Sequence, residues 1–199
     1  MHIADGIIPN VWCGAAHGVA WAGVYGFGRK VEPSEIVRMG LLASAMFAVS
    51  LVHFPIGGTS VHLGLYGLAG ILLGTRAIPV IFAALLFQTL LFQHGGLLSL
   101  GLNAVNMGAG ALTAAMLWRL PVLKRSTVPK AFLCGFTGIA IPALLLATEF
   151  TFVGYGKGFY FIATLYAAAG ALEGAITAAA VSFLHRAKPE LFSAGERPA

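Results

Sequence analysis

Seven apolar segments separated by short connections constrain this chain more than any other feature of its sequence. A helix needs about 20 mostly apolar residues to cross about 30 Å of hydrocarbon. Because such segments follow one another along the whole chain, we predict an all-α, polytopic membrane protein with about seven transmembrane helices in a single domain, residues 1–199. The segments run roughly over 11–28, 36–53, 63–75, 77–93, 98–118, 130–148 and 159–185.

The composition supports this membrane location. Hydrophobic residues make up 58% of the 199 residues and charged residues 10%, whereas soluble domains carry about 25% charged residues. The net charge is +5, but the basic residues are dispersed between apolar segments. We therefore expect lipid around the chain and no nucleic-acid partner.

The basic residues predict how the chain is oriented. With seven spans, alternate connections lie on the same side as the C-terminus, and they hold every Lys and Arg except Lys157. Cytoplasmic loops are enriched in Lys and Arg. We therefore expect the C-terminal tail, residues 186–199, in the cytoplasm and the N-terminus outside.

The third segment is too short to span a membrane alone. Its 13 residues, at 1.5 Å each, reach only about 20 Å. The connection before it must therefore dip into the membrane, which is tolerated only where that backbone is buried in protein.

The chain begins Met-His-Ile-Ala-Asp-Gly, with a histidine directly after the terminal residue. The α-amine of Met1, the amide nitrogen of His2 and the imidazole of His2 can close fused five- and six-membered rings on one metal ion. A planar all-nitrogen site suits Ni(II), Cu(II) or Co(II), and an α-amine with a pKa of about 7.7–8.0 loses its proton easily. We predict residues 1–10 to be an extracytoplasmic metal-chelating segment that needs a fourth nitrogen.

His62 is the candidate for this fourth ligand. It closes the outer connection His-Phe-Pro-Ile-Gly-Gly-Thr-Ser-Val-His at 53–62, which lies on the same side as Met1. The two glycines permit a tight backbone, and His62 opens the short third segment at membrane depth. An ionisable residue inside a membrane protein is a functional hypothesis by default.

Five motifs in this order resemble the CbiM/NikM family, the substrate-binding subunits of energy-coupling-factor cobalt and nickel transporters. The resemblance runs from residue 1 to about 192 and implies seven helices, with an outward N-terminus plugged into the bundle. It implies that Met1, His2 and His62 hold Co(II) or Ni(II), the transported substrate, without a bound organic cofactor. The motifs are Met-His-Ile-x-Asp-Gly at 1–6, Pro-x-Gly-Gly-Thr-Ser-x-His at 55–62, Gln88 followed by Leu-Phe-x-x-Gly-Gly at 91–96, Gly-x-Asn-x-x-Asn-Met at 101–107 and Glu-Gly-x-Ile-Thr at 173–177.

The resemblance also implies partners and a place in the cell. The partners are a transmembrane coupling subunit, two ATPase subunits and often a small accessory membrane subunit, in a prokaryotic inner membrane. The sequence itself has no nucleotide-binding loop, because Gly-Tyr-Gly-Lys-Gly at 154–158 lacks the upstream Gly and the following Ser or Thr. We expect no enzymatic activity in this chain and ATP hydrolysis in its partners.

Several polar residues have more than one interpretation. His94 stands where the family usually has Asp, and it is a spare ligand or lies on the access path of the metal. His53 ends the second segment as an interfacial residue or a secondary metal contact. Asn103 and Asn106 either hydrogen-bond between helices or orient His2 or His62. Thr59 and Ser60, close to His62, belong to the same group of candidates, and Glu173 should hydrogen-bond to a neighbouring helix.

Two other functions are conceivable. A metal-dependent intramembrane enzyme would need an open coordination position with a general base beside it, but the sequence has no His-Glu-x-x-His and no paired acids. A purely structural membrane subunit would have no reason to keep His2 and His62 on one side. Both Co(II) and Ni(II) suit nitrogen ligands, so the sequence leaves the choice between them open.

Overall fold

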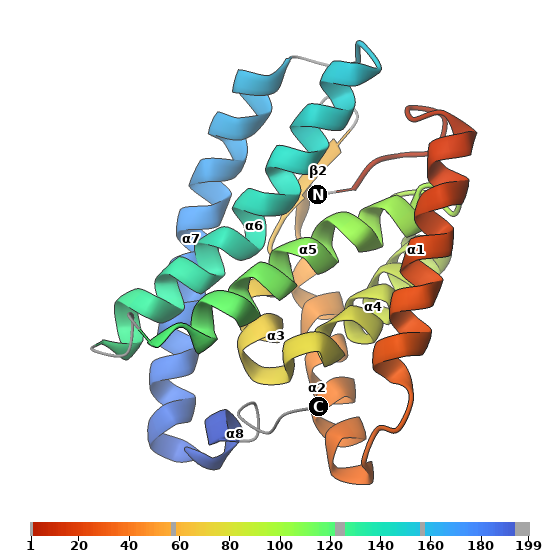
Figure 1. Cartoon of the computed structure of the whole chain (residues 1–199). Coiled ribbons are helices and arrows are strands. Elements are labelled where there is room, and N and C mark those ends of the chain that lie inside the picture. Colours follow the sequence, from red (N-terminus) through yellow and green to blue (C-terminus); the bar gives the residue numbers. More distant parts are fainter. Residues whose placement is uncertain (1, 57–58, 122–125, 156–157, 194–199) are drawn as a thin grey trace.

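The computed structural model describes residues 2–56, 59–121, 126–155 and 158–193, and it is dominated by helices (Figure 1). The predicted helical class is confirmed, since helices α1 to α7 correspond one to one to the seven apolar segments. The helices are α1 Asn10–Gly28, α2 Pro33–Ser50, α3 Tyr66–Leu73, the 3₁₀ turn η1 Gly74–Arg76, α4 Ala77–Phe92, α5 Leu100–Arg119, α6 Thr127–Phe152, α7 Phe159–Ala187 and the short α8 Glu190–Ser193.

A small β-hairpin departs from the expected all-α class. Strands β1, His53–Ile56, and β2, Thr59–His62, pair antiparallel between α2 and α3. The connection that they form is buried at Ser60 and His62, which are each 5% exposed. The prediction that protein surrounds this connection is therefore confirmed for these residues.

Four helical stretches of the described chain are long and apolar enough to cross a membrane: Tyr66–Phe92, Leu100–Arg119, Thr127–Phe152 and Phe159–Ala187. The first of them joins α3, η1 and α4, for which the sequence predicted two separate segments. Helices α1 and α2, with 19 and 18 residues, are not among the four. The chain is thus a multi-pass membrane protein, and its seven spans stay a prediction.

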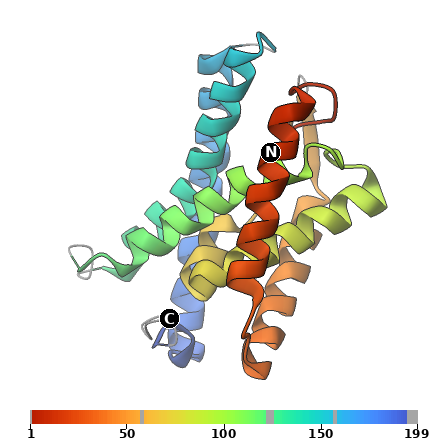
Figure 2. The same cartoon turned by 45° about the vertical axis from the view of Figure 1, so that its right-hand side comes forward.

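Helix α3 lies at the centre of the molecule, between α5 and α6 (Figure 1). Its two glycines allow this position, since a Cβ on Gly67 would collide with the backbone of Cys134, and one on Gly70 with that of Ala111. Small residues let membrane helices approach closely in this way. Around this centre α6 and α7 form a long pair, and α1 packs against α4 and α5 (Figure 2).

The two ends of the molecule differ in their chemistry. The N-terminal segment, the end of α6 and the start of α7 lie at the upper end in Figure 1, and the α1–α2 connection and α8 lie at the lower end. At the lower end the Arg76 side chain donates to the carbonyls of Phe27, Arg29 and Lys30 and lies 3.7 Å from Glu35. Basic residues of two connections predicted to be cytoplasmic therefore share one end, and the orientation stays a prediction.

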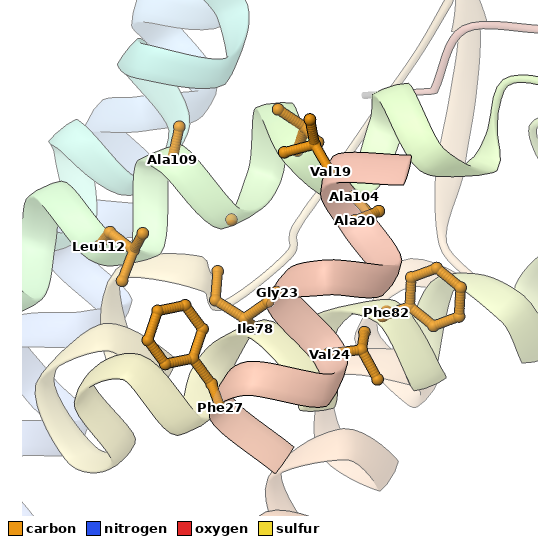
Figure 3. A pocket seen from close by; sticks show the side chains of 12 residues that line it. Val19, Ala20, Gly23, Val24, Phe27, Ile78, Phe82, Ala104, Ala109 and Leu112 are labelled. Carbon is orange, nitrogen blue, oxygen red and sulfur yellow. The ribbon is translucent and has the colours of Figure 1, made fainter. Parts of the chain in front are cut away.

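A groove between α1, α4 and α5 is lined entirely by apolar side chains and glycines (Figure 3). Val19, Ile78 and Leu112 come from the three helices and face it. None of its lining side chains carries an atom that binds a metal ion. Such atoms gather instead at the upper end, beside the N-terminal segment.

Candidate metal centre

The N-terminal segment runs into the protein, where His2 and Ile3 are 4% and 1% exposed. One side chain of α5 holds it there. The Asn103 carboxamide accepts a hydrogen bond from the Ile3 amide at 2.8 Å and donates one to the Ile3 carbonyl at 3.1 Å. Asn103 thus fixes the backbone next to His2. Met1, with the predicted amine ligand, lies outside the described residues.

A second attachment lies two residues further along, at Asp5. The Asp5 carboxylate accepts hydrogen bonds from the Ser99 amide at 2.9 Å and the Leu98 amide at 3.3 Å, directly before the start of α5. Unpaired amides and the helix dipole both favour an anion at this position. The Ser99 hydroxyl also donates to the Ile3 carbonyl at 2.6 Å. Asp5 and Ser99 therefore anchor the segment that carries His2.

The hairpin positions three further polar side chains. His53 pairs with His62 across the two strands, and Pro55 pairs with Ser60. Directly opposed residues, and residues two apart on one strand, project from the same face of a strand pair. His53, Ser60 and His62 therefore share one face. Thr59, another candidate, opens β2, but its side chain lies outside the described part of the chain.

Helix α7 holds this hairpin and the backbone that follows it. The Tyr166 hydroxyl donates to the Ser60 carbonyl at 2.9 Å, and the Glu173 carboxylate accepts from the Gly64 amide at 3.1 Å. Glu173 was expected to hydrogen-bond to a neighbouring helix, and it bonds instead to the backbone of the connection just before α3. Both contacts fix the backbone on either side of His62.

His94 joins the group from the end of α4. Gln93, with φ of 52°, ends that helix in the left-handed conformation, and the His94 Nε2 atom lies 2.6 Å from the Ser60 hydroxyl. The ring centroid of His2 is 4.1 Å from that of His94 and 4.8 Å from that of His62. One possible ligand atom from each of the three imidazoles lies within 4.8 Å of the other two.

Burial makes these imidazoles poor bases and leaves them ready to bind a metal ion. It is the main cause that lowers the pKa of His2 well below 6.5, and the rings of His62 and His94 lower it further. Burial likewise lowers the pKa of His62 well below that value, and it lowers the pKa of His94 to about 4. At neutral pH all three rings are uncharged, the state in which histidine binds metal ions.

The hydrogen bonds around His2 and His62 indicate which imidazole nitrogens are able to bind a metal ion. Among the described residues, the buried His2 Nε2 and Gln88 Oε1 atoms have no hydrogen-bond partner, and Gln88 lies close enough to raise the pKa of His2 slightly against the other effects. If His2 carries its proton on Nε2, the lone pair lies on Nδ1. The His62 Nδ1 atom donates to the Leu63 carbonyl at 2.8 Å, so its Nε2 carries the lone pair.

The remaining candidates have other contacts. Asn106 donates to both carboxylate oxygens of Glu149 on α6, at 3.0 and 2.9 Å, which is an interhelical contact. His17, which is half-buried on α1, donates to the Leu97 carbonyl at 2.9 Å. Sequence reasoning did not assign roles to Gln88 and Asp5. The one signal for Gln88 is its polar side chain within the apolar run of α4.

A multi-pass bundle with buried, neutral imidazoles at one end fits the class of membrane proteins that have a candidate site for a transition metal ion. A family model described as the cobalt uptake substrate-specific transmembrane region matches residues 2–191. The chain belongs to this family. It is accordingly a protein of the prokaryotic plasma membrane.

Relatives and solved structures agree with this assignment. The cobalt transport protein CbiM of Sorangium cellulosum is 33% identical over 212 residues, which cover 96% of this chain and 94% of that protein. A fused nickel transport protein NikMN of Rhodobacter capsulatus is 31% identical over 231 residues, and the chain spans 66% of its length. A crystal structure of a transition metal transporter, 24% identical, superposes with a TM-score of 0.83 over 99% of both chains, which supports the fold.

Proposed function

We propose that this chain is the substrate-specific membrane component of an energy-coupling-factor transporter that captures Co(II) or Ni(II) from outside and delivers it to the cytoplasm. The observation that carries the proposal is the group of three neutral imidazoles, His2, His62 and His94, with ligand atoms within 4.8 Å of one another. Relatives that are named as cobalt and nickel transport proteins support the choice of metal.

The ligand set follows from chelate geometry. The amide nitrogen and the imidazole of His2 close a six-membered ring only through Nδ1, the atom that a hydrogen bond from Nε2–H to Gln88 would leave with a lone pair. The Met1 α-amine adds a five-membered ring, and His62 supplies the fourth nitrogen through Nε2. Four nitrogens in a plane suit Ni(II) and tetragonal Co(II) better than Mg or Ca.

The proposal includes partners for the energetic step. We expect a transmembrane coupling subunit, two ATPase subunits and, in some assemblies, a small accessory membrane subunit. In this arrangement the chain binds the ion and changes its orientation in the membrane, while ATP is hydrolysed by its partners. The chain itself acts as a binding protein and not as an enzyme.

Metal titration of purified protein tests the ligand set. His62→Ala should weaken Ni(II) and Co(II) binding by about 100-fold or more, beyond the 10–100-fold typical of residues that only orient a ligand. A tag on Met1, or one Ala inserted after it, should do the same, because the amine then leaves the chelate. A C-terminal tag and His185→Ala, at the far end of α7, should bind as the native protein does.

Two results would contradict the proposal. Wild-type protein with a native N-terminus that binds neither ion would remove the capture function itself. Tight binding by the N-tagged or inserted forms would remove the amine from the ligand set and leave a site made of imidazoles alone.

A further inference from the structure

Four histidines form an unbroken series from the surface into the protein. His53 is exposed, His94 is half-buried, and His2 and His62 are 4% and 5% exposed. The ring centroids of His53 and His94 lie 4.1 Å apart, as do those of His94 and His2. Each ring therefore touches the next, and His94 is the link between the exposed ring and the buried pair.

Hydrogen bonds determine which nitrogen each outer ring offers. The Nδ1 atom of His53 lies 3.2 Å from the Leu51 carbonyl. A carbonyl only accepts, so this nitrogen carries the proton and Nε2 carries the lone pair. The Nε2 atom of His94 faces the Ser60 hydroxyl, which can accept as well as donate, so Nδ1 of His94 is able to bind an ion. Each ring of the outer pair, whose centroids lie 4.1 Å apart, thus offers one lone pair.

A hydrated divalent ion loses its water in steps, and each released water needs a replacement ligand. Imidazole is a suitable replacement for Ni(II) and Co(II). Two imidazoles at an exposed position bind the ion weakly enough to release it again. This release is needed if the ion is to move on to the buried histidines. His94 takes part in both positions, because its ligand atom lies within 4.8 Å of those of His2 and His62.

We propose that His53 and His94 form an outer loading site for a hydrated divalent transition-metal ion, which then passes through His94 to the buried pair His2 and His62. This inference rests on the proposed function, since it needs the buried pair as the destination. It assigns His53 a role in the rate of metal binding, whereas the buried ligands determine the affinity.

Stopped-flow mixing of Ni(II) with C-terminally tagged, full-length protein tests the loading site. In His53→Ala the association and dissociation rate constants should both fall by about tenfold, so that the Kd changes much less than either rate. A purely structural role of His53 would instead show as faster dissociation with an unchanged association rate. The matched control is His185→Ala, an exposed histidine at the other end of the chain, with wild-type rates.

Equilibrium titration in a second background isolates the outer pair. In N-terminally tagged His62→Ala protein, where neither the terminal amine nor His62 can bind the ion, a weaker Ni(II) site should remain, and adding His53→Ala or His94→Ala should abolish it. Association rates in His53→Ala within about twofold of wild type, or residual binding that survives both added substitutions, would overturn the loading site. Absence of Ni(II) binding to the wild-type protein would instead overturn the proposed function, so the two failures are distinguishable.

Discussion

His2 contributes to the proposed site through chemistry that no internal histidine has. Its ring is buried and neutral, and its neighbours are two more neutral rings. If only imidazoles bound the ion, no proton would be lost at neutral pH. If the terminal amine and the His2 amide also bound it, both would have to give up protons. The number of protons released therefore distinguishes the two ligand sets.

Calorimetry in buffers of different ionisation enthalpy measures that number. At pH 7 we expect Ni(II) binding to release about two protons, one from the amide and nearly one from an amine with a pKa of about 7.7–8.0. Apparent affinity should then rise as pH rises from 6 to 8, although the imidazoles, with their lowered pKa values, are neutral throughout this range. N-terminally tagged protein should release close to none. Zero protons from the native form would leave only the imidazoles as ligands.

For single residues, the sequence predicted the candidate metal ligands but not the residues that fix the position of these ligands. His2 and His62 could be chosen because a histidine after the α-amine and a histidine at membrane depth each have a chemical reason to bind metal. Asp5 and Ser99 contact each other across 94 residues of sequence. No local pattern indicates such a contact, since it arises only when the N-terminal segment meets the start of α5.

Helix α5 holds the N-terminal segment through Asn103, which hydrogen-bonds to the backbone of Ile3. Asn103→Leu would leave the buried Ile3 amide without its partner, at a cost of about 1–3 kcal/mol, while the Ile3 carbonyl would keep only the Ser99 hydroxyl as a donor. We expect Ni(II) affinity to fall by about 10–100-fold as the segment loses its fixed position. Titration of the purified variant measures this loss.

Thr113→Val provides the control on the same helix. The Thr113 hydroxyl donates only to the Ala109 carbonyl, one turn earlier in α5. This variant should bind Ni(II) as wild type does. If Asn103→Leu did so as well, the contact with Ile3 would have no role in holding the metal site.

The sequence predicted the helices of this protein but not its β-hairpin. The seven apolar segments predicted helices α1 to α7, because hydrophobicity over many residues is a strong local signal. The segment 53–62 was treated as an irregular connection, although a Gly-Gly pair between two short β-prone runs is a signal for a hairpin. The missed strands matter, because their pairing brings His53 and Ser60 to the face of His62.

For the whole molecule, the distribution of basic residues predicts which end faces the cytoplasm. Single cysteines placed at Ser126 and Tyr155, in a chain whose two buried native cysteines are replaced by Ala, test it. A membrane-impermeant thiol reagent added to intact cells should label Tyr155→Cys, and Ser126→Cys only after the cells are opened. Labelling of Ser126→Cys in intact cells would mean that the histidine cluster faces the cytoplasm.

In the proposed function, transport depends on subunits other than this chain. The chain has a candidate metal site at one end, and its sequence contains no loop that binds ATP. Cells that make this chain alone should bind radioactive Ni(II) or Co(II) but accumulate little of it, while cells that also make the coupling and ATPase subunits should accumulate it. His62→Ala in the complete assembly is the control for uptake through this site, and it should reduce accumulation to background. Equal accumulation with and without the partners would indicate a channel or a secondary carrier instead of a capture subunit.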